Sequence, residues 1–371
     1  MAARLGIDSQ KLQQFIADSP WDEQELWRAI RREVVPVMEP LAAWIIDETG
    51  WLKQGKRSVG VSHQYCGAVG KQANCQVSVE LVISDGTISV PAGGRLYLPE
   101  SWTSDRPRCR DAGVPEGIEF KTKPQIALDL IDEALGDQVL QAPVLADSVY
   151  GDNCGFRKGL RERGCEFFLQ VSPTQHKAWR HEVSTQKKFK RRYVVEGQPP
   201  AQSLLEIAQS LAPEQWKSCS WKARDGSTRH TRIAWLEVYL GHDLRNTHGE
   251  LERIWLVVDW PRGEVLYHCY LAHFKSLPSK ARCLRLSRGR WQIEQYFQRS
   301  KDDLGLDHYE GRSWRGFHHH LVLSAVAYLF VCAMWLRSKK NFWPDVGTDS
   351  QSDPPLAAEI LRLLSLLPSN V

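Results

Sequence analysis

Apolar and polar residues follow the period of β-strands through much of the first half of the chain. Strands are predicted at 41–47, 57–65, 75–84 and 87–98, bounded by glycines and by the Asp85-Gly86 hairpin signal. Residues 122–136 carry apolar positions at helical spacing and end at a glycine, and 139–147 then predict a buried strand. A meander followed by a helix and a further strand predicts a mixed α/β layer.

The flanking segments follow other patterns. Residues 1–36 predict helix, with Ser19 as an N-cap, Pro20 at the first helical position and Asp22 as the capping acid. A helix near 155–163 and a strand at 165–171 precede a basic, polar stretch and three further strands, near 231–240, 253–260 and 264–272. This part of the chain predicts an inserted β-rich unit, after which 278–304 is helical again.

One apolar run, at 321–336, contains no charged residue. It is shorter than the ~20 residues that a membrane-spanning helix needs, so a buried helix is expected rather than a membrane anchor. The N-terminal decapeptide has no apolar segment of the signal-peptide kind. The nine cysteines are irregularly spaced, with no C-x-x-C pair, which favours reduced thiols in a cytoplasmic protein.

The positive charge is concentrated in two places. The formal charge of +4 is small for 371 residues. Yet residues 172–195 hold seven Lys or Arg against one Glu, and residues 280–301 again hold seven against one. Charge runs are usually solvated faces, but a run on a helix that also carries chemistry indicates a track for phosphates.

Three apolar strands end in an aspartate, at Asp47, Asp147 and Asp259. Such an acid is exposed at the edge of a sheet while its strand stays buried, although each alone also fits a turn-forming residue. On the helix 286–304, Glu294 shares a narrow stripe with Arg290 and Lys301, because seven residues make almost two turns. A solvated ion pair between Arg290 and Glu294 is the alternative interpretation.

Four long motifs of the chain resemble those of a known protein family. They are IIDETGWLKQGKRSVGVSHQYCGAVGKQANCQV (45–77), RLYLPESW (95–102), VLADSVYGDN (144–153) and RWQIEQYFQRSKDDLGLDHYEGRSWRGFHHH (290–320). In this order they resemble the DDE superfamily of bacterial insertion-sequence transposases, endonucleases with an RNase H-like core. The resemblance implies an RNase H-like mixed sheet with flanking helices, interrupted by the β-rich insertion.

The resemblance also implies a set of site residues. The three metal-binding catalytic acids of the family correspond to Asp47, Asp147 and Glu294, and Asp259 falls in the insertion. The Tyr-x2-Arg-x3-Glu-x6-Lys signature of the last helix is met except at its tyrosine, where this chain has Ser287. Two Mg²⁺ ions, or Mn²⁺ in their place, would be held by these carboxylates and would activate the attacking oxygen and stabilise the leaving one.

The implied partner is double-stranded DNA, both the element ends and the target, and no membrane is expected. Whether the DNA complex is a homodimer stays open, and nucleoid association is expected only when DNA is bound. The DNA-binding residues predicted are Arg290, Lys301, Arg299, Lys187, Lys188, Lys190, Arg191 and Arg192.

The sequence also has two sets of ring-bearing residues of interest, the tryptophans of the insertion and three consecutive histidines. The tryptophans of the insertion are expected to be mostly core, with one able to stack on an unpaired base. His318, His319 and His320 are expected to be polar residues at a helix start, with DNA contact as an option.

The sequence thus predicts a Mg²⁺-dependent DNA-cleaving and strand-transferring transposase. The domains expected are an N-terminal helical segment at 1–40, core at 41–171, the insertion at 172–277, core with the catalytic helix at 278–338, and a tail at 339–371. Related proteins carry a further helical segment before the first residue, so the start is expected to be truncated. The alternatives are a catalytically silent DNA-binding regulator and, more distantly, a carbohydrate-processing enzyme with paired carboxylates.

Overall fold

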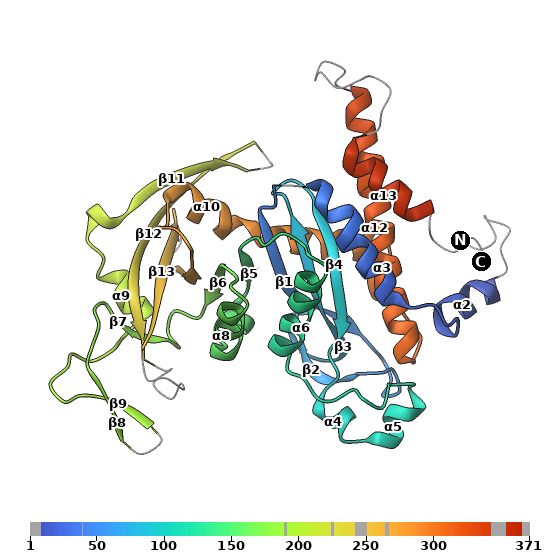
Figure 1. The fold of residues 1–371 in the computed structure, drawn as a ribbon, viewed down its shortest axis with the longest axis horizontal. Coiled ribbons are helices and arrows are strands. Elements are labelled where there is room, and N and C mark those ends of the chain that lie inside the picture. Colours follow the sequence, from blue (N-terminus) through green and yellow to red (C-terminus); the bar gives the residue numbers. More distant parts are fainter. Residues whose placement is uncertain are drawn as a thin grey trace. The chain divides into compact units, whose positions relative to one another are not determined.

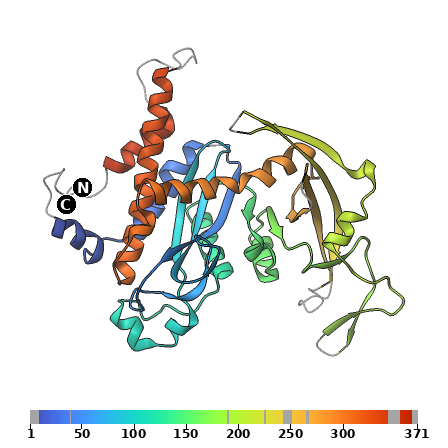
Figure 2. The ribbon, with the colours of Figure 1, turned by 180° about the vertical axis from the view of Figure 1, so that it is seen from behind.

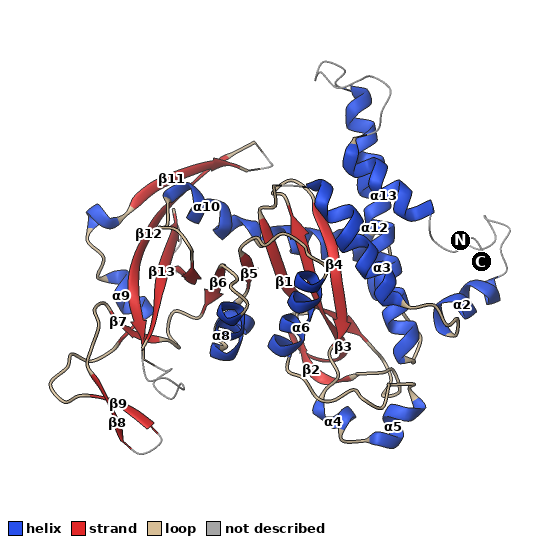
Figure 3. Ribbon diagram, in the orientation of Figure 1, coloured by secondary structure: helices blue, strands red, loops and turns tan. Residues whose placement is uncertain are grey.

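The chain forms two units that interleave along the sequence. In this computed structural model, residues 9–38, 40–188, 191–223, 226–241, 251–263, 267–342 and 354–365 are described. Residues 1–141 with 291–371 make up the first unit, and residues 142–290 make up the second. Helices flank a mostly antiparallel mixed sheet, which confirms the predicted mixed α/β, RNase H-like fold class (Figure 3).

The sheet of the first unit is a meander around one long strand. Its strands are β1 (Ala43–Leu52), β2 (Ser62–Cys66), β3 (Lys71–Ser84) and β4 (Ser89–Leu96). β3 pairs antiparallel with each of the other three: with β1 along one edge, and with β2 and then β4 along the other. All four predicted strands are present, although β1 runs five residues further than expected, through Leu52, and β2 begins at Ser62 rather than at residue 57.

Helices cover both faces of this sheet. A Cβ built on Gly93 would lie 3.2 Å from Leu130 of α6 (Lys123–Gly136), whereas one on Gly94 would lie 2.8 Å from Leu321 of α12 (Trp314–Phe342). Because neighbouring residues of a strand point to opposite faces, α6 and α12 cover opposite sides. Figure 1 shows α6 on one face, and Figure 2, seen from behind, shows α12 and α11 (Trp291–Asp302) on the other.

The N-terminal segment is broken rather than one helix. α2 (Ser9–Ala17) and α3 (Glu23–Ala29) are separated, and α3 continues into a π-helical turn (Ile30–Val34) and a 3₁₀ turn (Val35–Met38). The predicted cap at Ser19 is wrong. Asp22 is the N-cap instead, and its side chain accepts from the Gln24 amide at 2.9 Å. Ser and Asp are equally good N-caps, so the cap is decided by where the helix begins, at Glu23.

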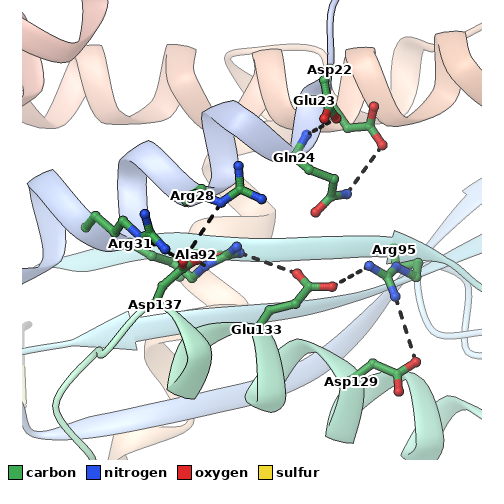
Figure 4. Close-up of polar contacts among 11 residues, drawn as sticks. Asp22, Glu23, Gln24, Arg28, Arg31, Ala92, Arg95, Asp129, Glu133 and Asp137 are labelled. Atoms are coloured by element: carbon green, nitrogen blue, oxygen red, sulfur yellow. Dashed lines mark hydrogen bonds and ion pairs between the residues drawn. The ribbon is translucent and has the colours of Figure 1, made fainter.

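A buried ion network joins this segment to α6. Arg31, which is 3% exposed, donates to Asp137 at 2.6 Å and to the Ala92 carbonyl at 2.9 Å. Glu133 pairs with both Arg31 and Arg95, so the contacts extend across the α6 face of β4 (Figure 4). The arginines of this network are matched by acids within the unit.

The apolar run is part of α12, which is packed against the sheet in its first half. Its residues Trp314–Ser338 are long and apolar enough to cross a membrane by length and composition alone, and 44% of the most apolar window is buried. Phe317, Leu321 and Ala325 are fully buried, whereas Phe330, Met334 and Trp335 further along are exposed. α13 (Pro355–Ser365) packs against this helix. The remaining short elements of the unit are α4 (Glu100–Thr103), α5 (Arg106–Asp111) and the 3₁₀ turn η4 (Leu306–His308).

The second unit is richer in strands. Its sheet has the order β10-β7-β12-β13-β14-β6-β5, with β11 beside β12, and only β5 and β6 pair in parallel. The strands are β5 (Val144–Ala146), β6 (Phe167–Val171), β7 (Lys177–Trp179), β10 (Gln202–Ser203), β11 (Lys217–Lys222), β12 (Thr228–Leu240), β13 (Glu252–Pro261) and β14 (His268–His273), with a separate hairpin of β8 (Thr185–Lys188) and β9 (Arg191–Val194). Its helices are α7 (Ser148–Gly151), α8 (Cys154–Glu162), α9 (Leu204–Gln209), the turn η3 (Pro213–Gln215) and α10 (Lys280–Gly289). The predicted β-rich character of the insertion is therefore confirmed, while the five-part domain division stays a prediction.

None of the nine cysteines, all of which lie in the described residues, forms a disulfide. The prediction of thiols rather than a disulfide framework is confirmed.

Candidate active site

Asp47 lies in the middle of β1, a strand that is buried on both faces. Its side chain is 8% exposed, and the Glu48 amide donates to its Oδ1 at 2.8 Å. In the antiparallel ladder Asp47 stands directly opposite Glu80 of β3. Side chains directly opposite each other lie on the same face, so two carboxylates are neighbours at this point of the sheet.

The contacts of Glu80 show which face of the sheet carries these two carboxylates. It is fully buried and accepts from the Ser78 hydroxyl and from the Tyr296 hydroxyl, each at 2.9 Å. Burial raises the pKa of Glu80 to about 7, against the opposing effect of these two hydrogen bonds. Tyr296 belongs to α11, so Asp47 and Glu80 stand on the face that α11 covers.

Glu294 lies near the start of α11, on its exposed side. Gln292 accepts from Ser84, which pairs with Ala43 in the ladder, and Lys301 donates to the Gly50 carbonyl at 3.0 Å. The helix thus follows β1, its first turn near the beginning of the strand and its last turn near the end. The helix that carries Glu294 therefore covers the face on which Asp47 lies, and the predicted common site of the two acids stays a prediction.

Asp147 belongs to the second unit and directly follows β5. It caps α7, and its Oδ1 accepts from the Val149 amide at 2.9 Å. Close packing fixes this turn, because a Cβ on Gly151 would lie 2.0 Å from the Gln170 carbonyl oxygen of β6. The turn-forming interpretation of Asp147 is therefore correct for one of its oxygens, and its predicted catalytic role remains untested.

The donor chemistry of the three predicted ligands fits a hard cation. All are carboxylates, and Mg²⁺ prefers oxygen ligands. Among the described residues, no three His, Cys, Asp or Glu side chains converge into a ready metal-binding group. Within the first unit, Asp47 lies on the face of the sheet that is covered by α11, the helix of Glu294. Asp147 belongs to the second unit.

Asp259, the third strand-ending acid, is in a different environment. It is fully buried on β13, where it accepts from Thr231 and pairs with Arg288 of α10 at 2.7 Å. The guanidinium of Arg288 also lies 4.3 Å from the Trp221 ring. These partners give Asp259 a structural role, in agreement with its assignment to the insertion.

The predicted DNA-binding residues lie in three settings. Arg299 is exposed on α11, and Arg290 is a half-buried residue at the end of α10. Burial lowers the pKa of Lys301, whose ammonium is turned toward the Gly50 carbonyl, while the charge of Asp307 opposes that shift. The basic hairpin has Lys187 and Lys188 on β8 and Arg191 and Arg192 on β9, and Lys190 lies outside the described residues.

The three histidines lie in the first turns of α12, as expected, but His318 and His319 are not open to DNA and His320 is half-buried. His318 and His319 are 2% and 0% exposed. His319 is bound to the carbonyls of Ile16 and Trp21 and stacks on the Trp21 ring at 3.7 Å. His320 is bound to the Leu306 carbonyl at 3.0 Å. All three hold neighbouring segments of the chain against α12.

The insertion tryptophans are more exposed than expected, because Trp216, Trp221, Trp235, Trp255 and Trp260 all remain only partly buried. Trp216, Trp260 and Tyr267 form an aromatic cluster, and the Arg232 guanidinium lies 3.9 Å from the Trp260 ring. This cluster adjoins a cavity of about 420 Å³ that Trp260 helps to line.

Glu80 and Tyr296 were missed from the sequence. Glu80 interrupts the apolar strand 77–83, and an acid at such a position signals a buried partner. Tyr296 stands at helical spacing with Ile293 and Phe297 and is indistinguishable from a core aromatic in the sequence.

Comparisons with known proteins agree with this geometry. The model of the DDE superfamily endonucleases matches residues 1–230, a range that includes Asp47 and Asp147 and ends before Glu294. The chain is 33% identical over 189 residues to a protein of Microchaete diplosiphon described as a probable transposase for insertion sequence element IS701, a match that covers 47% of this chain and 46% of the relative. The chain thus spans about half the length of this curated relative. Because the family model matches more than half of its residues, the chain belongs to the DDE superfamily endonucleases.

Proposed function

We propose that the protein is a transposase that cleaves DNA strands and joins them to a target at the ends of an insertion sequence. The observation that carries the proposal is the packing of α11, the helix of Glu294, on the face of the sheet that carries Asp47, in a chain of the DDE family. The description of the relative as a probable transposase points the same way. Double-stranded DNA is the proposed substrate.

Asp47, Asp147 and Glu294 are the proposed ligands of two Mg²⁺ ions, for which Mn²⁺ substitutes. Bound there, the ions would activate a water or a 3′-hydroxyl and stabilise the leaving oxygen of the phosphodiester. Around these ligands, the chain's own residues orient the acids. The Glu48 amide fixes one Asp47 oxygen, and the Tyr296 hydroxyl and the Lys301 ammonium hold α11 against the strands.

The test is cleavage of duplexes that carry the two element ends. With Mg²⁺, the full chain should nick or cut at the end, and EDTA should abolish the reaction. Asp47→Ala, Asp147→Ala and Glu294→Ala should each remove cleavage while folding and DNA binding persist. Normal turnover by any of the three would refute the assignment of that acid.

Two variants serve as controls. Asp111→Asn changes an exposed acid at the end of α5 and should cleave normally. Asp259→Ala removes the other strand-ending acid and should leave cleavage per folded molecule near normal, although the fold is less stable without the partner of Arg288. Binding without any cleavage by the wild-type chain would favour a catalytically silent regulator.

A further inference from the structure

The loop that follows β1 carries a group of cations that no part of the proposed mechanism uses. Residues 53–58 form one wall of a cavity of about 890 Å³, and residues 307–312 form the other. Four cationic residues line it, Lys53, Lys56, Arg57 and Arg312, against the two acids Asp307 and Glu310. All of these residues belong to the first unit.

The backbone of this loop is held by polar side chains behind it. The Asn74 amide donates to the carbonyls of Lys53 and Gly55, at 2.7 and 2.8 Å. Arg108 donates to the Lys56 carbonyl at 2.7 Å, and Gln76 donates to the Val59 carbonyl at 2.6 Å. These bonds turn backbone acceptors inward and fix the loop, so little conformational entropy remains to be lost when a ligand binds.

The cationic side chains at the outer end of the loop are exposed to solvent. Lys56 and Arg57 are exposed, as is Arg312 on the facing segment, which is joined to the loop by a bond of 3.1 Å from the Val59 amide to the Arg312 carbonyl.

The charges of the two acids of the cavity act on inner cations: both act on Lys53, and Asp307 also acts on Lys301. Burial lowers the pKa of Lys53, and the charges of Glu310 and Asp307 oppose that shift. The Lys53 ammonium is also bound to the Tyr309 carbonyl. The three outer cations therefore make the open side of the cavity positive.

We propose that this cavity is a binding site for the DNA phosphate backbone, with Lys56, Arg57 and Arg312 as its contact residues. Lys53 directly follows the last residue of β1 and comes six residues after Asp47. Six residues of extended chain span about 20 Å. At about 3.4 Å per base pair this length corresponds to about six base pairs, so the phosphates bound here lie on the order of six base pairs from the scissile bond. The site thus holds the duplex at a second point, and this inference rests on the proposed function.

The first test is the salt dependence of binding to an end-containing duplex. Each phosphate contact contributes about 0.9 to the slope of log K against log salt, so Lys56→Ala/Arg57→Ala should lower the slope by about two units. The affinity advantage of the wild type over this variant should then shrink about tenfold between 50 and 200 mM salt. The charge-retaining pair Lys56→Arg/Arg57→Lys should keep the wild-type slope, and Glu310→Gln should raise the affinity at low salt. An unchanged slope in the alanine pair would overturn the proposal.

The second test locates the contact. Neutral methylphosphonates are placed one at a time at each phosphate within eight base pairs of the cleavage site, on both strands. Near the proposed distance the substitution should weaken binding of the wild type but not weaken the alanine pair further, since the same contact is lost only once. Equal losses for both proteins at every position would overturn the assignment.

The outcomes separate this inference from the proposed function. Binding is measured in the presence of EDTA and does not require cleavage. If the wild type fails to cleave yet the slope and methylphosphonate results hold, the transposase proposal fails and the phosphate site stands. If the wild type cleaves but neither binding result appears, only the phosphate site is refuted.

Discussion

The buried imidazole of His318 makes a specific prediction for the pH dependence of stability. Its Nδ1 bonds the Trp314 carbonyl at 2.9 Å, and its Nε2 accepts from the Leu96 amide at 3.4 Å, an arrangement that fits only the neutral ring. Burial lowers the pKa of His318 to about 4, against the attraction of Glu23 and with smaller contributions from Arg95 and His319. The folded state therefore resists protonation far below pH 6.5.

The direction of this pH dependence follows from how many protons the folded and unfolded chains bind. Below pH 6.5 the unfolded chain takes up a proton at this position and the folded chain does not, so the free energy of unfolding falls as the pH falls from 6.5 to 4. The full difference is about 3 kcal/mol, and about 2 kcal/mol of it is already lost at pH 5. Above pH 7 the His318 ring is neutral in both states and does not change the free energy of unfolding with pH.

Urea unfolding of the wild type and His318→Gln at pH 7.5 and pH 5 measures this effect. Glutamine retains an acceptor for the Leu96 amide and carries no charge at either pH. The variant should be less stable than the wild type at pH 7.5, by about 1 kcal/mol for the lost hydrogen bond. At pH 5 this deficit should disappear or reverse. His63→Gln, at an exposed position of β2, is the matched control and should leave the pH difference unchanged. The same deficit for His318→Gln at both pH values would refute the reasoning.

Three further outcomes follow from named contacts. Asp137→Ala leaves the buried Arg31 guanidinium without its closest carboxylate and should lower the free energy of unfolding by about 3 kcal/mol in urea titrations. Tyr296→Phe removes a donor from the buried Glu80 carboxylate and should cost about 1–3 kcal/mol. It should also slow cleavage without changing the Kd for DNA, which stopped-flow cleavage and gel-shift measurements check separately. Lys301→Ala should reduce the log-salt slope of DNA binding by about one unit if its ammonium contacts a phosphate, and an unchanged slope would limit its role to the Gly50 carbonyl.

Local patterns predicted the elements that carry the site. The strands near Asp47 and Asp147 and the helix with Glu294 all exist, because strand alternation and helical spacing are properties of short segments. Their bounds were less accurate: the strand predicted at 139–147 is only Val144–Ala146, and the helix predicted at 278–304 is two helices, α10 and α11. The N-terminal cap was wrong because two plausible capping residues, Ser19 and Asp22, stand three positions apart, and the choice depends on which helix start the tertiary structure supports.

Burial of polar residues was harder to predict. A run of three histidines at a helix start looks solvated, yet each ring finds a backbone carbonyl as partner, and two of these carbonyls lie about 300 residues earlier in the chain. Such partners are invisible to any local window. The same holds for Glu80, whose partner Tyr296 lies 216 residues away.

The contrast between Asp47 and Asp259 shows why the environment decides between two identical patterns. The sequence predicts that both acids end apolar strands and are exposed there, but both lie within their strands and are buried. Asp259 is already neutralised by Arg288, so a bound cation would have to displace that guanidinium and leave it without its anion. Asp47 stands opposite a second buried carboxylate, Glu80, whose hydrogen bonds come from neutral hydroxyls. Burial raises the pKa of Glu80 to about 7, so this side chain is protonated in part near neutral pH and no cation is needed to hold it in the sheet. The environment thus separates the two acids: the ion pair with Arg288 gives Asp259 a role in holding the fold, whereas Asp47 is the acid that we propose as a metal ligand.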